Sequence, residues 1–113
     1  YTSPAADTLK MVKILETIED YEEAIKTPGL VVIDFFATWC GPCKMIGPKF
    51  EEFSKKYTGA SFFKVDVDEN EDAAAEADIS AMPTFHFLKD GELVGTILGP
   101  DVAKLEEMIL NHL

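Results

Sequence analysis

The chain has 113 residues, of which 47% are apolar and 27% charged, and its formal net charge is −11. This length is enough for one domain with a substantial core and too short for two. The negative field repels nucleic acid and anionic lipid, and no apolar run approaches the roughly 20 residues of a membrane-spanning helix, so we expect neither kind of partner.

The first ten residues, YTSPAADTLK, have the composition of a disordered stub. We therefore predict a flexible N-terminal extension over residues 1–9 and one folded domain over residues 10–113. The sequence starts with Tyr1 instead of Met, which favours a cleaved targeting segment upstream.

The first half of the domain is predicted to contain two strands that alternate with two helices. We expect a short strand over Lys10–Leu15 and a helix over Thr17–Lys26 that Thr17 caps. The segment Leu30–Phe36, LVVIDFF, is almost uniformly apolar, as is typical of a central strand covered on both faces. A longer helix is predicted over Cys40–Tyr57, with apolar residues spaced for one buried stripe.

The second half is predicted to add three strands and two helices. Ser61–Val67 is a strand, and Asn70 caps a short alanine-rich helix over Asn70–Asp78. Thr84–Lys89 and Glu92–Leu98 flank an Asp-Gly turn and predict a β-hairpin, after which Asp101 begins the last helix. This order predicts an α/β fold with a central mixed five-stranded sheet flanked by helices.

The segment TWCGPCK contains the only tryptophan and both cysteines, Cys40 and Cys43, and three interpretations compete for the thiols. A structural disulfide is disfavoured, because a loop of two residues constrains little chain. A closed zinc site needs four ligands, and only His86 and His112 could add nitrogen donors, 26 positions apart, so we expect no metal. A reversible dithiol is favoured, because the pair follows a central strand and opens a helix, where α/β proteins place chemistry.

Helix geometry supports the dithiol interpretation. If Cys40 caps the helix and Cys43 lies in its first turn, the two sulfurs are neighbours on one face. Backbone N–H groups and the helix dipole then favour a thiolate at Cys40, which is the form that attacks disulfides. Asp34 lies in the preceding apolar strand, where burial should raise its pKa and make it a proton carrier near neutrality. The alternative is an Asp34 that faces solvent at the end of the strand.

Several separated features resemble the thioredoxin family over about residues 11–113. They are the string WCGPC, an aspartate six residues before its first cysteine, Pro48 inside the following helix, the loop Met82-Pro83-Thr84, Gly91 and Gly99. Phe36 departs from the pattern, since many members carry a second tryptophan there.

The resemblance implies roles for the residues that match. Cys40 is the attacking nucleophile, Cys43 is the resolving thiol, and Asp34 handles the proton of Cys43. Lys64 matches a lysine near that acid, although a simple solvated lysine stays open as an alternative.

The resemblance also implies a substrate-binding surface around the sulfurs. The Met82–Pro83 peptide bond is expected to be cis, and the backbone of Met82 is expected to pair with substrate in a strand-like contact. An open apolar patch is implied around the cysteines, formed by Trp39, Gly41, Pro42, Leu98 and Gly99.

The function implied by the resemblance is a thiol–disulfide oxidoreductase that reduces protein disulfides. Such a protein maintains cell redox homeostasis and donates electrons to reductive enzymes such as peroxiredoxins. The chain itself is expected to bind no cofactor, and its electrons come from NADPH through a flavoprotein thioredoxin reductase. We expect a monomer in a reducing compartment, with the mitochondrial matrix favoured over the cytoplasm.

Two rival functions stay open from the sequence. A disulfide oxidase or isomerase of the same fold is disfavoured by the Gly-Pro pair between the cysteines. A histidine there would strengthen the thiolate and make the disulfide more oxidising. The other rival is a non-catalytic binding module, in which the patch holds a partner protein and the thiols are incidental.

Overall fold

The computed structural model describes residues 12–113, so the extension predicted for residues 1–9 lies outside the described part of the chain. The described residues form a mixed five-stranded sheet in the order β1-β3-β2-β4-β5. Its strands are β1 (Val12–Ile14), β2 (Leu30–Phe36), β3 (Ala60–Asp66), β4 (Thr84–Lys89) and β5 (Glu92–Leu98). Strands β1, β3 and β2 are parallel, and β4 and β5 are each antiparallel to the strand before them in the sheet. The predicted mixed sheet is therefore confirmed.

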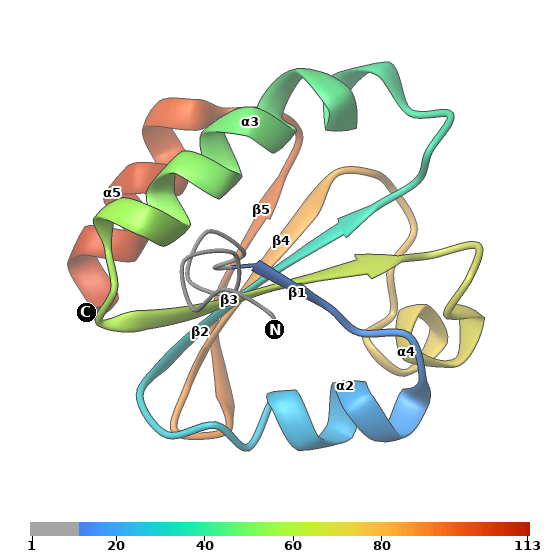
Figure 1. Cartoon of the computed structure of the whole chain (residues 1–113), viewed down its shortest axis with the longest axis horizontal. Helices are drawn as coiled ribbons and strands as arrows, with labels where there is room; N and C mark the ends of the chain where they lie inside the picture. The colour runs from blue at the N-terminus through green and yellow to red at the C-terminus, as the bar shows by residue number, and fades with distance from the viewer. Residues whose placement is uncertain (1–11) are drawn as a thin grey trace, which may run out of the picture.

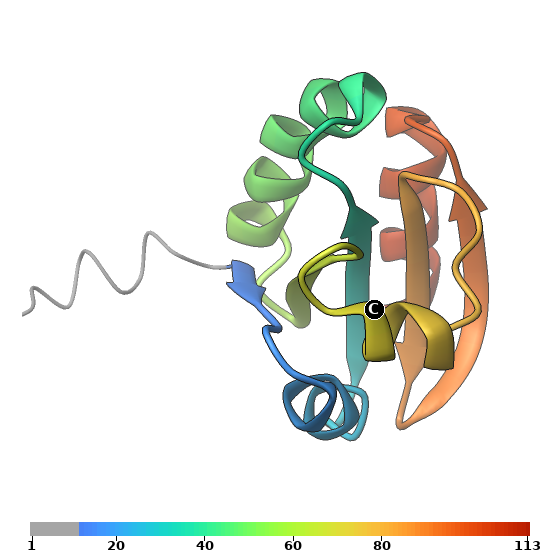
Figure 2. The same ribbon diagram turned by 90° about the vertical axis from the view of Figure 1, so that its right-hand side faces the viewer.

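Helices cover both faces of this sheet (Figure 1). Helices α3 (Gly41–Lys56) and α5 (Val102–His112) lie on one side, and α2 (Ile18–Ala24) and α4 (Glu71–Glu76) lie on the other. In the turned view of Figure 2, α4 lies in front of the strands. No helix within residues 12–113 combines the length and apolar character needed to cross a membrane.

The central strand β2 separates two apolar cores. Alternate side chains of a strand point to opposite faces, so Val32 packs with Phe50 and Phe85 under α3 and α5. On the other face, Phe35 packs with Tyr21 in a second cluster near α2 and α4. Each of the first six residues of β2 is buried, which confirms that this strand is covered on both faces.

Short polar side chains start the helices where the sequence predicts them. The side chains of Thr17, Asn70 and Asp101 accept hydrogen bonds from backbone N–H groups at 3.1, 3.3 and 3.0 Å. These bonds satisfy donors that the first turn of a helix leaves without intrahelical partners. Helices α2, α4 and α5 therefore begin at the predicted positions.

Some element ends differ from the prediction by one or two residues. The helix predicted to continue to Lys26 ends at Ala24, because the N–H groups of Lys26 and Thr27 bond back to carbonyls only three residues earlier. Strand β3 ends at Asp66, one residue earlier than predicted. The carboxylate of Asp66 accepts the N–H of Asp68 at 2.9 Å, and this local bond turns the chain out of the sheet.

Candidate active site

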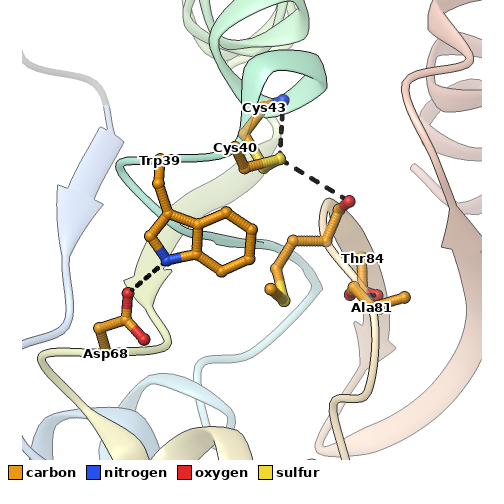
Figure 3. Close-up of a disulfide and its surroundings, with 7 residues drawn as sticks. Trp39, Cys40, Cys43, Asp68, Ala81 and Thr84 are labelled. Atoms are coloured by element: carbon orange, nitrogen blue, oxygen red, sulfur yellow. Dashed lines mark hydrogen bonds between the residues drawn. A yellow bond between two sulfur atoms is a disulfide. The ribbon is translucent and has the colours of Figure 1, made fainter.

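The two cysteines lie where β2 ends and α3 begins. Cys40 is the N-cap of α3 with φ −86° and ψ 109°, and its Sγ accepts the N–H of Cys43 at 3.2 Å. Cys43 lies in the first turn, and its Cα is 5.3 Å from that of Cys40 in a disulfide (Figure 3). Pro42 fits this turn because its fixed φ suits a helix start and its missing N–H costs no intrahelical bond there.

The start of α3 is electrostatically suited to a thiolate. Sulfur at the N-cap faces the free N–H groups and the positive end of the helix dipole. The first turn of α3 contains no acidic residue, so no carboxylate there opposes a negative sulfur. When the disulfide is reduced, this setting favours the thiolate at the N-cap, which is the reactive form.

The Met82–Pro83 peptide bond is cis, as the resemblance implies, and its loop packs against the disulfide. Cys40 Sγ lies 3.7 Å from the carbonyl oxygen of Met82, whose side chain packs on the cluster that contains both cysteines. Two hydrogen bonds hold the loop in place. Gly99 donates its N–H to the Pro83 carbonyl at 2.9 Å, and the Thr84 hydroxyl donates to the Ala81 carbonyl at 2.6 Å.

Large apolar side chains close in sequence to the cysteines or to the cis-proline loop and its Gly99 anchor face solvent. Trp39, Met45 and Leu98 are 67%, 69% and 68% exposed, whereas each cysteine is only 5% exposed. The indole N–H of Trp39 donates to the carboxylate of Asp68 at 2.8 Å, which orients the ring beside the sulfurs (Figure 3). A Cβ built on Gly41 meets no atom within 4 Å, so the approach at that residue is open.

Asp34 is buried beneath the disulfide, so the solvent-facing alternative is wrong. It is 1% exposed, and its Oδ1 has no hydrogen-bond partner in the described residues. Burial raises the pKa of Asp34 from 3.8 to about 7, the positive charge of Lys64 opposes this rise, and the negative charge of Glu51 adds to it. Asp34 and Cys43 both line one pocket of about 430 Å³. The pocket therefore joins the acid to the inner cysteine.

Lys64 lies on the neighbouring parallel strand, directly beside Asp34 in register. Its ammonium pairs with the Glu51 carboxylate of α3 at 3.3 Å and lies 5.3 Å from the centre of the Phe36 ring. The lysine side chain is 20% exposed, so Lys64 is not the freely solvated residue that the sequence left as an alternative.

The two histidines do not approach the cysteine pair as a metal site would require. His86 is buried in β4 with its ring centre 5.0 Å from that of Phe35, and burial lowers its pKa. His112 is near the end of α5, where its ring Nδ1 lies 2.9 Å from the Met108 carbonyl oxygen. Within residues 12–113, no three His, Cys, Asp or Glu side chains are grouped to hold a metal ion.

Sequence reasoning missed three residues of this site. Met45 is exposed two residues after Cys43, Asp68 holds the Trp39 ring, and Glu51 pairs with Lys64. Asp68 could have been found, because it follows β3 at the same sheet edge where β2 delivers the cysteines. Glu51 could also have been found, because it is eight residues after Cys43 and therefore close to the same face of the helix.

A cysteine pair at the start of a helix, beside a cis-proline loop and above a buried acid, defines a thiol–disulfide oxidoreductase of mixed α/β fold. Comparison with known proteins agrees. The thioredoxin family model matches residues 12–111. Thioredoxin-1 of Schizosaccharomyces pombe is 50% identical over 103 residues, which cover 91% of this chain and all of the relative.

Solved structures agree as well. Fasciola hepatica thioredoxin is 47% identical with a TM-score of 0.86, over 89% of this chain and 99% of that one. Mitochondrial thioredoxin 3 of Saccharomyces cerevisiae is 40% identical with a TM-score of 0.85, over 92% and 98%. The chain belongs to the thioredoxin family and is a protein-disulfide reductase. In this family the cysteine pair carries the electrons, which come from NADPH through a thioredoxin reductase.

Proposed function

We propose that Cys40 is the nucleophile and Cys43 the resolving thiol of this reductase. The Cys40 thiolate attacks a substrate disulfide, forms a mixed disulfide and releases one substrate thiolate. The Cys43 thiolate then attacks Cys40 Sγ, which closes the Cys40–Cys43 disulfide and releases the second substrate thiolate. The substrate gains two electrons and the pair loses two. The observation that carries this assignment is that Cys40 caps α3 while Cys43 lies one turn deeper.

We propose that Asp34 accepts the proton of Cys43 during the second step. Both residues line the same pocket of about 430 Å³, which is large enough for water to connect them. A pKa of about 7 lets Asp34 both take and release a proton near neutrality. Lys64 is the cation nearest in register to Asp34, and its charge favours the ionised carboxylate that is ready to accept the proton.

Docking of the substrate is assigned to the surface around the disulfide. The exposed ring of Trp39 and the open backbone at Gly41 and Pro42 give an extended peptide access to the sulfur. On the other side, we assign Met82 and Pro83 to backbone pairing with that peptide, with Gly99 anchoring their loop. The resemblance to the thioredoxin family implies these six residues together with Leu98.

The partners we propose are disulfide-bearing proteins, including reductive enzymes such as peroxiredoxins, and a thioredoxin reductase. The activity belongs in a reducing compartment, because the pair must be returned to its dithiol form after each cycle. We place the activity in the mitochondrial matrix, and mitochondrial thioredoxin 3 of Saccharomyces cerevisiae is one of the similar structures. Imaging of the tagged protein in cells against matrix and cytoplasmic markers tests it.

Insulin reduction with dithiothreitol as the electron source tests the chemistry. The wild-type protein should accelerate the reaction, whereas Cys40→Ser should not, because it removes the attacking sulfur. Asp34→Asn should slow turnover about 100-fold or more at pH 7, because a positioned proton-transfer residue typically contributes about 10²–10⁴-fold. Wild-type activity no greater than that of Cys40→Ser would reject the reductase. Full activity of Asp34→Asn would reject the role of Asp34.

A redox titration against glutathione separates a reductase from an oxidase or isomerase. The Gly-Pro pair puts no imidazole beside Cys40, so we expect a potential near the value of about −270 mV known for thioredoxins. A potential near about −180 mV, as in protein disulfide isomerase, would favour the rival function.

A further inference from the structure

In the pocket beneath the disulfide, the Lys64 ammonium lies within reach of two carboxylates, those of Asp34 and Glu51. Lys64 is beside Asp34 in strand register, and both face α3, but its Nζ pairs with Glu51 at 3.3 Å. Within residues 12–113, Asp34 forms no ion pair with Lys64, and Asp34 Oδ1 has no hydrogen-bond partner. All three side chains line the same pocket, together with Cys43. The two carboxylates therefore compete for one cation.

The burial of Asp34 and of Glu51 determines how much each carboxylate gains from an ion pair with Lys64. Asp34 is 1% exposed, so its negative charge is poorly solvated and would gain much from a contact with Lys64. The Glu51 side chain is 43% exposed, so water already stabilises its charge and the ion pair is worth less there. The Phe36 ring lies 5.3 Å from the same ammonium and adds attraction at the outer position. Glu51 and Phe36 together hold the cation away from the buried acid.

Within residues 12–113, no other charged side chain forms an ion pair with Asp34 or with Lys64. From α3, the charged or titratable groups that line the pocket are Lys44, Glu51 and, once reduced, Cys43. From β3 the only one is Lys64, and the partners of Asp34 and Phe35 across β4 are the non-titratable Phe85 and Thr84. Only Lys64 and Glu51 act through their charges on the pKa of Asp34.

We propose that Glu51 is a positioning residue that holds the Lys64 ammonium at the rim of the pocket and thereby keeps Asp34 able to carry a proton at neutral pH. If Lys64 moved to Asp34, the carboxylate would be neutralised by an ion pair and would accept a proton poorly. The inference rests on the proposed role of Asp34. It adds that Glu51, which touches neither sulfur nor substrate, sets the pH range in which the inner cysteine is deprotonated.

The titration of Asp34 in the oxidised protein tests the inference directly. The cysteines do not titrate in the disulfide form, so the ¹³C carboxyl signal of Asp34 reports that group without coupling to the thiols. Glu51→Gln removes the competing charge and frees Lys64, so the midpoint should fall by about 0.5–1 pH unit. Glu52→Gln is the matched control, because Glu52 is the next residue, is 60% exposed and pairs with Lys49 at 3.2 Å. It should leave the midpoint within about 0.2 unit.

The Lys64→Met background shows whether Glu51 acts through the lysine. There, Glu51→Gln should shift the Asp34 midpoint by less than half of its shift in the wild-type background. Equal shifts in the two backgrounds would contradict the positioning role and leave only direct repulsion between the carboxylates. A Glu51→Gln midpoint that matches the Glu52→Gln control would overturn the proposal altogether.

Kinetics of the reduced protein distinguish the positioning role of Glu51 from the proposed proton-transfer role of Asp34. The rate at which Cys43 resolves a preformed mixed disulfide should show a pH midpoint that falls in Glu51→Gln along with the Asp34 titration. If Asp34→Asn leaves that pH profile unchanged, the role of Asp34 fails even when the Asp34 signal shifts in Glu51→Gln. If Asp34→Asn alters the profile but Glu51→Gln does not, only the positioning role fails.

Discussion

At the scale of single residues, Asp34 is a buried carboxyl that is suited to proton transfer but lowers the stability of the folded state. Its pKa is about 7 in the folded protein and near 3.8 when unfolded, so the folded state holds the proton more tightly. Between pH 4 and pH 7 the unfolded chain has already lost this proton, so the free energy of unfolding falls as pH rises. Above about pH 7 both states have lost the proton, so the loss of stability caused by Asp34 is complete and no longer changes with pH.

Asp34→Asn should remove this loss, since the amide carries no charge at any pH. In the oxidised protein, the variant should match the wild type near pH 4 and exceed its free energy of unfolding by up to about 4 kcal/mol at pH 8. Urea unfolding at pH 4, 6 and 8 measures the difference. A difference that does not grow with pH would show that Asp34 is ionised in the folded state.

At the scale of elements, α4 depends on one side chain that joins it to the end of β1. Asn70 caps α4 through the Ala73 N–H, and its amide nitrogen donates to the Leu15 carbonyl at 3.0 Å while 4% exposed. Asn70→Ala should lower the free energy of unfolding by about 2–3 kcal/mol, because it removes the cap and leaves a buried carbonyl unpaired. Asp101→Ala, which removes only an exposed cap, should cost about 1 kcal/mol. Equal losses in urea unfolding would mean that the bond to Leu15 contributes nothing.

Elements were predictable from the sequence where local signals were strong. The uniform apolar run of β2, the Asp-Gly turn between β4 and β5, and the side chains that cap α2, α4 and α5 each place an element without knowledge of the rest. The ends of α2 and β3 were less predictable, because weak local bonds at Lys26 and Asp66 decide them.

The site was predictable in part for the same reason. Cys40 and Cys43 are neighbours in sequence, and Asp34 is marked as a charge within an apolar strand. Glu51 and Asp68 were missed, because the role of each depends on a partner that only the folded structure brings into contact. Those partners are Lys64, 13 residues from Glu51, and Trp39, 29 residues from Asp68.

At the scale of the whole molecule, the negative charge is concentrated on one side. Residues 16–28 and 66–80 contain twelve carboxylates and one lysine, a balance of −11 that equals the net charge of the chain. These segments include α2 and α4, which lie on the same side of the sheet in Figure 1. The rest of the sequence is neutral overall, so the protein presents a strong electrostatic asymmetry to its partners.

This asymmetry predicts how salt affects the choice of substrate. The rate constant for a lysine-rich peptide disulfide should fall as NaCl rises from 10 to 500 mM, because salt screens the attraction. A glutamate-rich peptide disulfide of the same length should react faster as salt rises. Stopped-flow reduction of the two peptides gives both slopes. Equal slopes would show that the acidic side does not influence approach to the disulfide.

The capture of a mixed disulfide is the most direct test of Cys40 as the attacking sulfur. Reduced Cys43→Ser, mixed with a disulfide substrate, should accumulate a covalent complex through Cys40, because the resolving sulfur is missing. Reduced Cys40→Ser should accumulate none, because Cys43 lies inside the first turn of α3 and lacks the N-cap position that favours a thiolate. Intact mass spectrometry and peptide mapping identify the bond. A complex that forms through Cys43, or in neither variant, would contradict the assignment of Cys40 as the attacking sulfur.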